Sequence, residues 1–180
     1  MSVGHNHTVE ERHAAQYDHL CRQAWFKMAM AYRPSVIVSF DLPYVGGSSV
    51  GQERVYVDVN AYPIIAKAGL LPGLLKHEHV EGVLLEHGWH YAIEPLASHL
   101  VATVAENREY AMRGISLEHA NRLYAPLIKA DEHERLACCP RDLHMEPYTE
   151  PPVDRELLAA VREAQGRDIG DDVWGVYAGL

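Results

Sequence analysis

The sequence has few cysteines and lacks any long apolar run. Cys21, Cys138 and Cys139 are its only cysteines, an odd number without the spacing of a disulfide framework or a zinc knuckle. No stretch approaches the roughly 20 apolar residues that cross a bilayer. The N-terminus also lacks the basic region and apolar run of a signal peptide. We therefore expect a soluble, cytoplasmic protein that folds without disulfides and does not enter a membrane.

A basic patch is missing as well. The 16 Lys and Arg residues are outnumbered by 25 Asp and Glu residues, which gives a formal net charge of −9. This balance argues against a nucleic-acid partner. With 48% hydrophobic residues, the chain has an ordinary globular composition. Its length fits a single domain over residues 1–180, with a flexible lead-in at residues 1–7. Nothing in the sequence fixes the oligomeric state.

Apolar periodicity and capping residues predict a mainly helical α+β fold. Alternating β-branched residues predict two strands on either side of a glycine-rich turn, and we expect them to form a small antiparallel sheet packed on the central helix. Residues 140–180 should form an extended, proline-containing strap (residues 140–153), then a C-terminal helix and a tail. The helices are expected at residues 8–32, 70–87, 95–113, 117–137 and 154–165, and the strands at residues 35–42 and 54–59.

Histidine is unusually frequent, with 12 in the chain. Those near the N-terminus, such as His5 and His7, suit a polar lead-in that binds metal only adventitiously. The informative histidine lies in residues 76–88, KHEHVEGVLLEHG. His77 and Glu81 are one helical turn apart on one face, and Glu78 lies on the same side. Because burying these groups on an apolar helix is costly, the pattern favours a divalent metal that neutralises the carboxylates.

The following helix carries a second polar stripe. His99 and Glu106 lie on one side of it, with Thr103 between them. The connection between the two helices is short, so they should be neighbours in space and both stripes can face one point. We expect Glu106 either to orient a ligand histidine or to be a fourth ligand. Tyr91 and Tyr110 are lesser candidates for hydrogen bonding to a substrate oxyanion.

These residues resemble the zincin metallopeptidases, in the gluzincin-type arrangement whose ligands lie on two consecutive helices. In zincins the first helix carries H-E-x-x-H, where two histidines bind zinc and the glutamate is the general base. Here Glu81 stands at the second histidine position, and the third ligand would be His99, 18 residues later. The stretch over residues 36–115 also resembles small phage- or prophage-associated proteins with the pattern H-E-x-x-E…H…E.

The resemblance implies one Zn²⁺ per chain, or another divalent metal, held by His77, Glu81 and His99 with one position open. Glu78 would then be the general base. The implied function is a zincin-like hydrolase that cuts an amide or peptide bond of a peptide or protein substrate. The strand at residues 55–58 would take the place of the zincin edge strand, which aligns an extended substrate.

Three other interpretations stay open. The histidine and glutamates could form a solvated helix face with ordinary i,i+4 pairs. The chain could be a non-enzymatic, phage-related or interaction protein whose structural metal site is closed by Glu106. A di-iron carboxylate bundle would need paired E-x-x-H motifs, of which we find only Glu10-x-x-His13.

Overall fold

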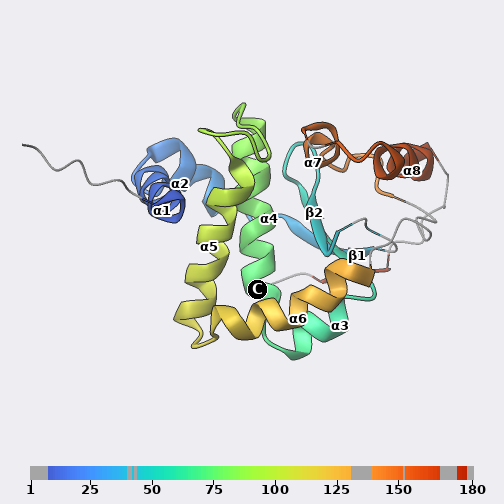
Figure 1. Cartoon of the computed structure of the whole chain (residues 1–180), viewed down its shortest axis with the longest axis horizontal. Coiled ribbons are helices and arrows are strands. Elements are labelled where there is room, and N and C mark those ends of the chain that lie inside the picture. Colours follow the sequence, from blue (N-terminus) through green and yellow to red (C-terminus); the bar gives the residue numbers. More distant parts are fainter. Residues whose placement is uncertain are drawn as a thin grey trace, which may run out of the picture.

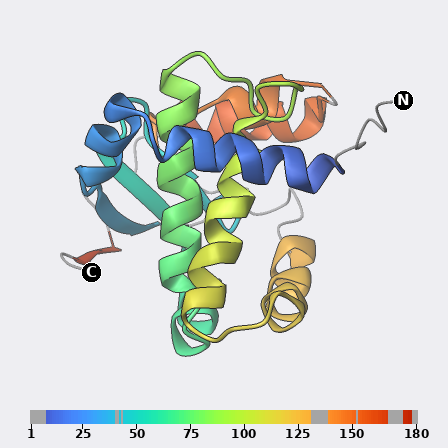
Figure 2. The same cartoon turned by 90° about the vertical axis from the view of Figure 1, so that its left-hand side faces the viewer.

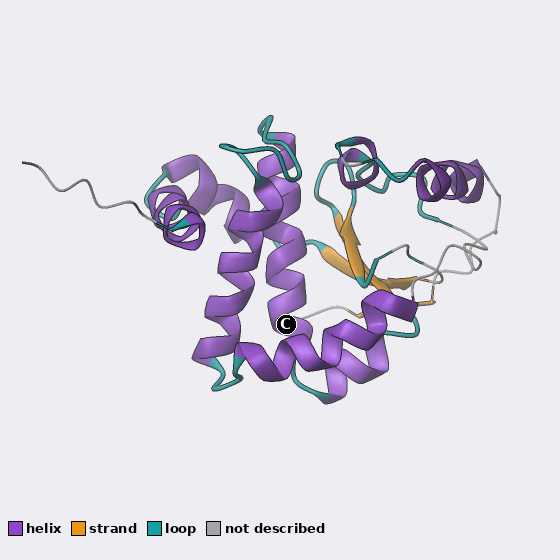
Figure 3. Cartoon of the chain, in the orientation of Figure 1, coloured by secondary structure: helices purple, strands orange, loops and turns teal. Residues whose placement is uncertain are grey.

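The computed structural model describes residues 8–39, 42, 44–130, 139–151, 153–166 and 174–177. The fold is α+β, mainly helical with one small sheet (Figures 1 and 3). The expectations for residues 1–7 and 131–138, which include His5, His7 and Cys138, lie outside the described residues. The elements in order are α1 (Val9–Leu20), α2 (Ala24–Ala31), β1 (Ser35–Ser39), β2 (Gly46–Ser48), β3 (Arg54–Asp58), α3 (Tyr62–Lys67), α4 (Leu71–Glu86), α5 (Ser98–Met112), α6 (Leu117–Ala130), α7 (Glu146–Thr149), α8 (Arg155–Gly166) and β4 (Trp174–Tyr177).

Helices α4 and α5 lie side by side at the centre of the molecule (Figures 1 and 2). The prediction of a helix over residues 70–87 is confirmed, with Pro72 in its first turn and Gly88 at φ +78° just beyond its end. α4 is buried on nearly all sides, because α1, α2 and α5 cover one side and the sheet covers the other. None of the described helices is long and apolar enough to cross a membrane.

Helix α5 begins later than the sequence predicts. Its first residue is Ser98 rather than Pro95. Residues 90–97 instead form a small loop in which the amide of His90 donates to the carbonyl of Leu96 (3.0 Å) and the amide of Ser98 donates to the carbonyl of His90 (2.8 Å). This loop fixes where α5 starts and therefore the height of its first turn beside α4.

The N-terminal region is two helices rather than the single helix expected over residues 8–32. The expected capping box is present, since Thr8 and Glu11 bond reciprocally to each other's backbone amides. The chain then turns at Cys21 and becomes extended at Gln23. The turn lets both helices pack on the central pair; Phe26 of α2 meets Tyr17 of α1 edge-on, with 6.2 Å between ring centroids. Burial of both apolar faces explains the break.

The sheet is mixed, with strand order β2-β3-β1-β4. The expected antiparallel pairing of residues 35–42 with residues 54–59 is wrong, because β1 and β3 are parallel. The glycine-rich segment is not merely a turn: residues 46–48 form β2, which pairs antiparallel with β3. β2 therefore takes the hairpin position next to β3, and β1 lies on β3's other side. Consequently β2, not β3, is the edge strand beside α4.

The C-terminal half also departs from the sequence expectation in detail. α6 continues through Pro126. The strap contains the short helix α7, and α8 agrees with the helix predicted over residues 154–165. Part of the tail joins the sheet as β4, which pairs antiparallel with β1.

Two glycines of α4 allow neighbours to approach its backbone closely. A Cβ atom on Gly82 would lie 2.8 Å from the Oγ of Ser48 in β2. A Cβ atom on Gly73 would lie 2.0 Å from the ring of Tyr110 in α5. A side chain at position 73 would overlap the Tyr110 ring, and one at position 82 would require Ser48 to shift. They set the distance of α4 from the edge strand and from α5.

We expect the substitution Gly73→Ala to destabilise the protein. Alanine favours a helix interior by up to ~1 kcal/mol over glycine, but overpacking against the buried Tyr110 ring should cost ~1–3 kcal/mol. The net effect should be a lower urea midpoint with an unchanged m-value. A raised midpoint would contradict the close packing of α4 and α5 at this point.

Candidate metal centre

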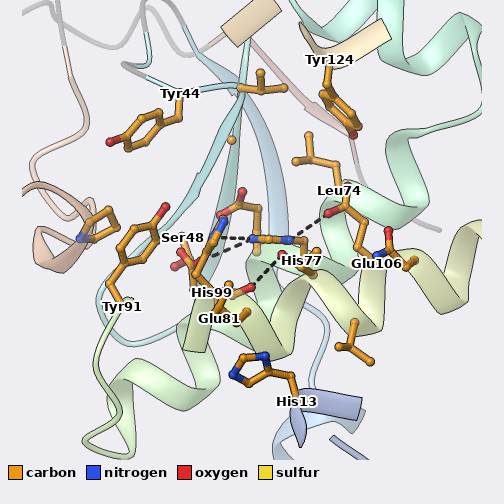
Figure 4. Close-up of a pocket in the computed structure, with 18 of the residues that line it drawn as sticks. His13, Tyr44, Ser48, Leu74, His77, Glu81, Tyr91, His99, Glu106 and Tyr124 are labelled. Atoms are coloured by element: carbon orange, nitrogen blue, oxygen red, sulfur yellow. Dashed lines mark hydrogen bonds and ion pairs between the residues drawn. The ribbon is translucent and has the colours of Figure 1, made fainter. Parts of the chain in front are cut away.

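Three potential ligand atoms converge between α4 and α5 (Figure 4). The Nε2 of His77 lies 3.2 Å from the Nδ1 of His99 and 3.4 Å from the Oε2 of Glu81. The Nδ1 of His99 lies 2.9 Å from the same Glu81 oxygen. Ligands that surround one zinc ion tetrahedrally at ~2.0–2.1 Å are ~3.3 Å apart. This buried group could therefore hold a metal ion with little rearrangement.

The ligand set comes from two helices that the sequence predicts as neighbours. His77 and Glu81 are one turn apart on α4. His99 lies in the first turn of α5, where its amide donates to the carbonyl of Tyr91 (3.0 Å). The 90–97 loop thus sets the height of His99 against α4. The structure brings all three predicted ligands together.

Glu106 lies on the far side of His77 from the other ligands. Its Oε2 is 2.9 Å from the Nδ1 of His77, and its Oε1 accepts a 2.7 Å hydrogen bond from the hydroxyl of Tyr110. Tyr110 in turn bonds to the hydroxyl of Tyr124 in α6 (2.8 Å). Because both oxygens of Glu106 are engaged, it is placed to orient His77 rather than to complete the ligand set.

Glu78 is buried on the side of α4 that faces the edge strand. A Cβ atom on Gly46 of β2 would lie 2.7 Å from the Oε1 of Glu78, so only glycine leaves room for this carboxylate. Burial and, to a lesser extent, the nearby charge of Glu81 together raise the pKa of Glu78 to about 8. In the metal-free protein this carboxyl group therefore holds its proton near neutral pH.

The pKa values of the two candidate ligands on α4, Glu81 and His77, are shifted in opposite directions. Burial raises the pKa of Glu81, but hydrogen bonds from His77 and His99 outweigh it and lower the pKa to about 2. Burial lowers the pKa of His77, but hydrogen bonds to Glu106 and Glu81 outweigh it and raise the pKa well above its ordinary range. Without a metal, a proton on His77 is thus the cation that balances these carboxylates.

The interpretation as a solvated helix face is wrong. His77, Glu78 and Glu81 are only 7%, 7% and 5% exposed. Such groups are costly to bury unless a cation compensates for them. The di-iron interpretation gains no support, because His13 bonds to Glu94 at 2.8 Å rather than to the ligand group. His79 is not part of the cluster; burial lowers its pKa to about 4, and the backbone of Ala29 in α2 opposes this shift.

A pocket of about 950 Å³ opens above the ligand group. Helices α4 and α5 supply the ligand group, while α1, α6, β2 and the strap supply other parts of its lining. Tyr91 lies beside His99, with 4.8 Å between ring centroids (Figure 4). Further in, Tyr44 stacks on Tyr148 of α7 at 5.2 Å. The lining is mostly apolar, as in pockets that take organic ligands.

Sequence reasoning missed the parts of this site that come from far along the chain. The sequence predicts a turn at Gly46, whereas the structure places it in β2, where it pairs antiparallel with β3. Tyr124, Leu143 and Tyr148 carry no local signal, because only the path of the chain brings them to the pocket.

Comparison with known proteins adds no assignment. A scan against protein-family models finds no match, and searches of the curated proteins and of the solved structures find none either. The chemistry of this centre must therefore be argued from its geometry.

We expect the metal-free protein to lose stability as pH rises from about 6.5 to about 8. The folded state holds protons on His77 and Glu78 that the unfolded chain releases near pH 6.5 and pH 4.5. The free energy of unfolding then falls with pH, because the folded state binds more protons. The depressed pKa of Glu81 acts only below about pH 4.5 and does not oppose this trend.

Thermal unfolding in the presence of a chelator tests this expectation, since ~1 kcal/mol shifts the melting temperature by ~2–4 °C at this size. The Glu78→Gln variant should show a shallower decline. With saturating zinc the gain in melting temperature should instead grow with pH, because the ligands must lose their protons. A chelated protein that becomes more stable over this interval would contradict the protonated cluster.

Proposed function

We propose that this protein is a zinc-dependent hydrolase of zincin type that cuts an amide bond of a peptide. The convergence of His77, Glu81 and His99 on one point carries the proposal. Two imidazoles and one carboxylate suit zinc, although other divalent metals remain compatible with them. Catalytic zinc sites have three protein ligands and one open position. The carboxylate of Glu106 behind His77 matches the support that metal-bound histidines usually receive.

Zinc in such a site lowers the pKa of water towards ~7 and polarises a carbonyl group. Glu78 is the general base in this proposal. Its carboxylate lies one residue from His77, faces the pocket and has no place among the three ligands. It would take a proton from the attacking water and pass it to the departing nitrogen. In the overall reaction, water adds across the amide, the C–N bond breaks, and a carboxylate and an amine form.

Tyr91 is suited to hydrogen bonding to the developing oxyanion. Burial raises the pKa of Tyr91, and the carboxylate of Glu81 raises it further, so the phenol stays protonated and can donate. It lies beside His99 on the pocket wall. Electrostatic donors of this type often provide a large part of the rate enhancement of acyl transfer.

The alternative of a structural metal in a phage-related interaction protein needs a closed site. Glu106 is the nearest candidate for the fourth ligand, but Tyr110 and His77 already occupy its two oxygens. The pocket over the ligand group also gives a small molecule access. Both observations favour an open site and therefore a catalyst.

We expect His99→Ala to lose both zinc and the stability that zinc provides. His99 links the two central helices through the metal, so binding free energy is partly folding free energy. Elemental analysis should find about one zinc per wild-type chain and almost none in the variant. The exposed His119→Ala on α6 is a matched control and should keep the metal, as should a variant lacking residues 1–7. Equal zinc content in wild type and His99→Ala would contradict the ligand set.

We expect Glu78→Gln to keep its zinc and its fold but to lose hydrolysis by ~10²–10⁴-fold, the usual contribution of a positioned general base. Glutamine preserves shape and hydrogen bonding but cannot accept the proton. Turnover of a peptide mixture, followed by mass spectrometry, is the measurement. The control Glu109→Gln, on the outer side of α5 in an ion pair with Arg113, should leave turnover unchanged. An inert, zinc-loaded wild type would count against the enzyme.

A further inference from the structure

The edge strand β2 presents free main-chain groups beside the proposed general base. The amide of Asp58 donates to the carbonyl of Val45, and the amide of Ser49 donates to the carbonyl of Arg54, both at 3.0 Å. In an antiparallel ladder this alternation turns the N–H and C=O of Gly46 and Ser48 away from β3. Beyond the sheet ladder, the described residues make no backbone hydrogen bond to the N–H or C=O of Gly46. An extended peptide could therefore pair with Gly46 next to Glu78.

The strap already occupies the next part of this edge. The amide of His144 donates to the carbonyl of Ser48 (2.9 Å), and the amide of Val50 donates to the carbonyl of Asp142 (2.7 Å). The strap thus runs antiparallel to the chain just beyond β2, and Ser49 faces Leu143. A strand rises ~3.3 Å per residue, so Gly46 and Ser48 are ~7 Å apart. A peptide paired with Gly46 has room for about two residues before it meets the strap.

Side chains hold the strap firmly in this position. Asp142 accepts hydrogen bonds from the Arg54 guanidinium (2.8 Å) and the Tyr56 hydroxyl (2.5 Å) of β3. The buried His144 lies between the carboxylates of Glu86 (3.2 Å) and Glu146 (3.0 Å). The strap is therefore a wall tied to both the sheet and α4, and it closes one end of the substrate path.

Direction and charge indicate which end of a peptide meets this wall. Antiparallel pairing is slightly more stable than parallel pairing, and it is the pairing that the strap itself adopts on this edge. It would place the amino end of a bound peptide nearest Ser48 and the strap. At the closed end His144 lines the pocket, and the carboxylates of Glu86 and Glu146 lie behind it. Of the described residues that line the pocket, only Arg108 is a lysine or arginine, and it is bonded to Asp18.

From this arrangement we propose that the site takes the free amino end of a peptide and removes about one or two residues from it, rather than cutting within a chain. The inference rests on the proposed hydrolase for its chemistry. The position that it gives to the amino end of the peptide depends only on the strap and on β2. Leu143 is the residue to test, because its Cδ1 would lie 2.7 Å from a Cβ atom on Gly47 and its side chain lines the pocket.

The first experiment uses a peptide of about ten residues with a free amino end and the same peptide acetylated. Mass spectrometry with the zinc-loaded wild type should find cuts only after the first one or two residues. Acetylation should lower kcat/KM by at least ~10-fold, which corresponds to one lost polar interaction of ~1.4 kcal/mol. Cuts at internal bonds, with equal rates for both peptides, would overturn the inference and leave the hydrolase standing.

The second experiment measures binding without turnover. Zinc-loaded Glu78→Gln, titrated calorimetrically with both peptides, should bind the free amino end at least ~10-fold more tightly. Adding Leu143→Ala, or the milder Leu143→Val should the first not fold, should reduce this preference to less than ~3-fold. The matched control Leu157→Ala lies in the same apolar cluster but not in the pocket, and it should keep the full preference.

The two experiments separate the two proposals. A wild type that binds the free amino end preferentially but cuts no peptide would overturn the hydrolase and retain the recognition of a peptide end. Equal binding of both peptides, or a preference that Leu143→Ala and Leu157→Ala alter alike, would overturn the role of the strap.

Discussion

The whole centre depends on a shortage of positive charge between α4 and α5. Glu81 and Glu106 are carboxylates with little access to water, whereas the neighbouring Glu78 holds its own proton near neutral pH. Among the described residues, two imidazoles face the carboxylates, those of His77 and His99. In a medium of low polarity an uncompensated carboxylate is costly, so a cation must be supplied. A proton on His77 supplies one positive charge, and the raised pKa of His77 means that this proton is held at neutral pH. A divalent ion would supply two and could engage both imidazole lone pairs, so the same group that holds a proton could hold a metal ion.

The geometry persists because the neighbouring backbones approach α4 very closely. Gly82 admits Ser48 of β2, and Gly46 of β2 admits the carboxylate of Glu78. These reciprocal glycines bring the edge strand against the helix that bears two of the ligands. On the opposite side Gly73 admits the ring of Tyr110, whose hydroxyl reaches Glu106. The three glycines thus leave room for Ser48, Glu78 and Tyr110 against α4 or β2. A small change in packing at any of them would shift the candidate ligand atoms.

Much of this centre could be predicted from sequence because its ligands lie on regular elements. The spacing of His77 and Glu81 fixes their relative position once α4 is a helix. His99 follows from the short connection between two helices. The strand pairing could not be predicted in the same way, since alternation identifies a strand but not its neighbour. A three-residue strand of two glycines and a serine has no β propensity to reveal it, and the misreading of β2 as a turn led directly to the wrong pairing of β1 with β3.

The strap shows why the limits of a pocket are harder to infer than its chemistry. Leu143 and Tyr148 meet β2 and Tyr44 from almost 100 residues further along the chain. No periodicity in the sequence encodes such a contact. The strap is held by the carboxylate of Asp142, which bonds to Arg54 and Tyr56 of β3, and by the buried His144. Yet this segment lies along the chain just beyond β2 and lines part of the pocket. On the proposed function, the H-E-x-x-E…H…E pattern would supply the bond-breaking groups, whereas the path of the C-terminal chain would determine which peptides can reach them.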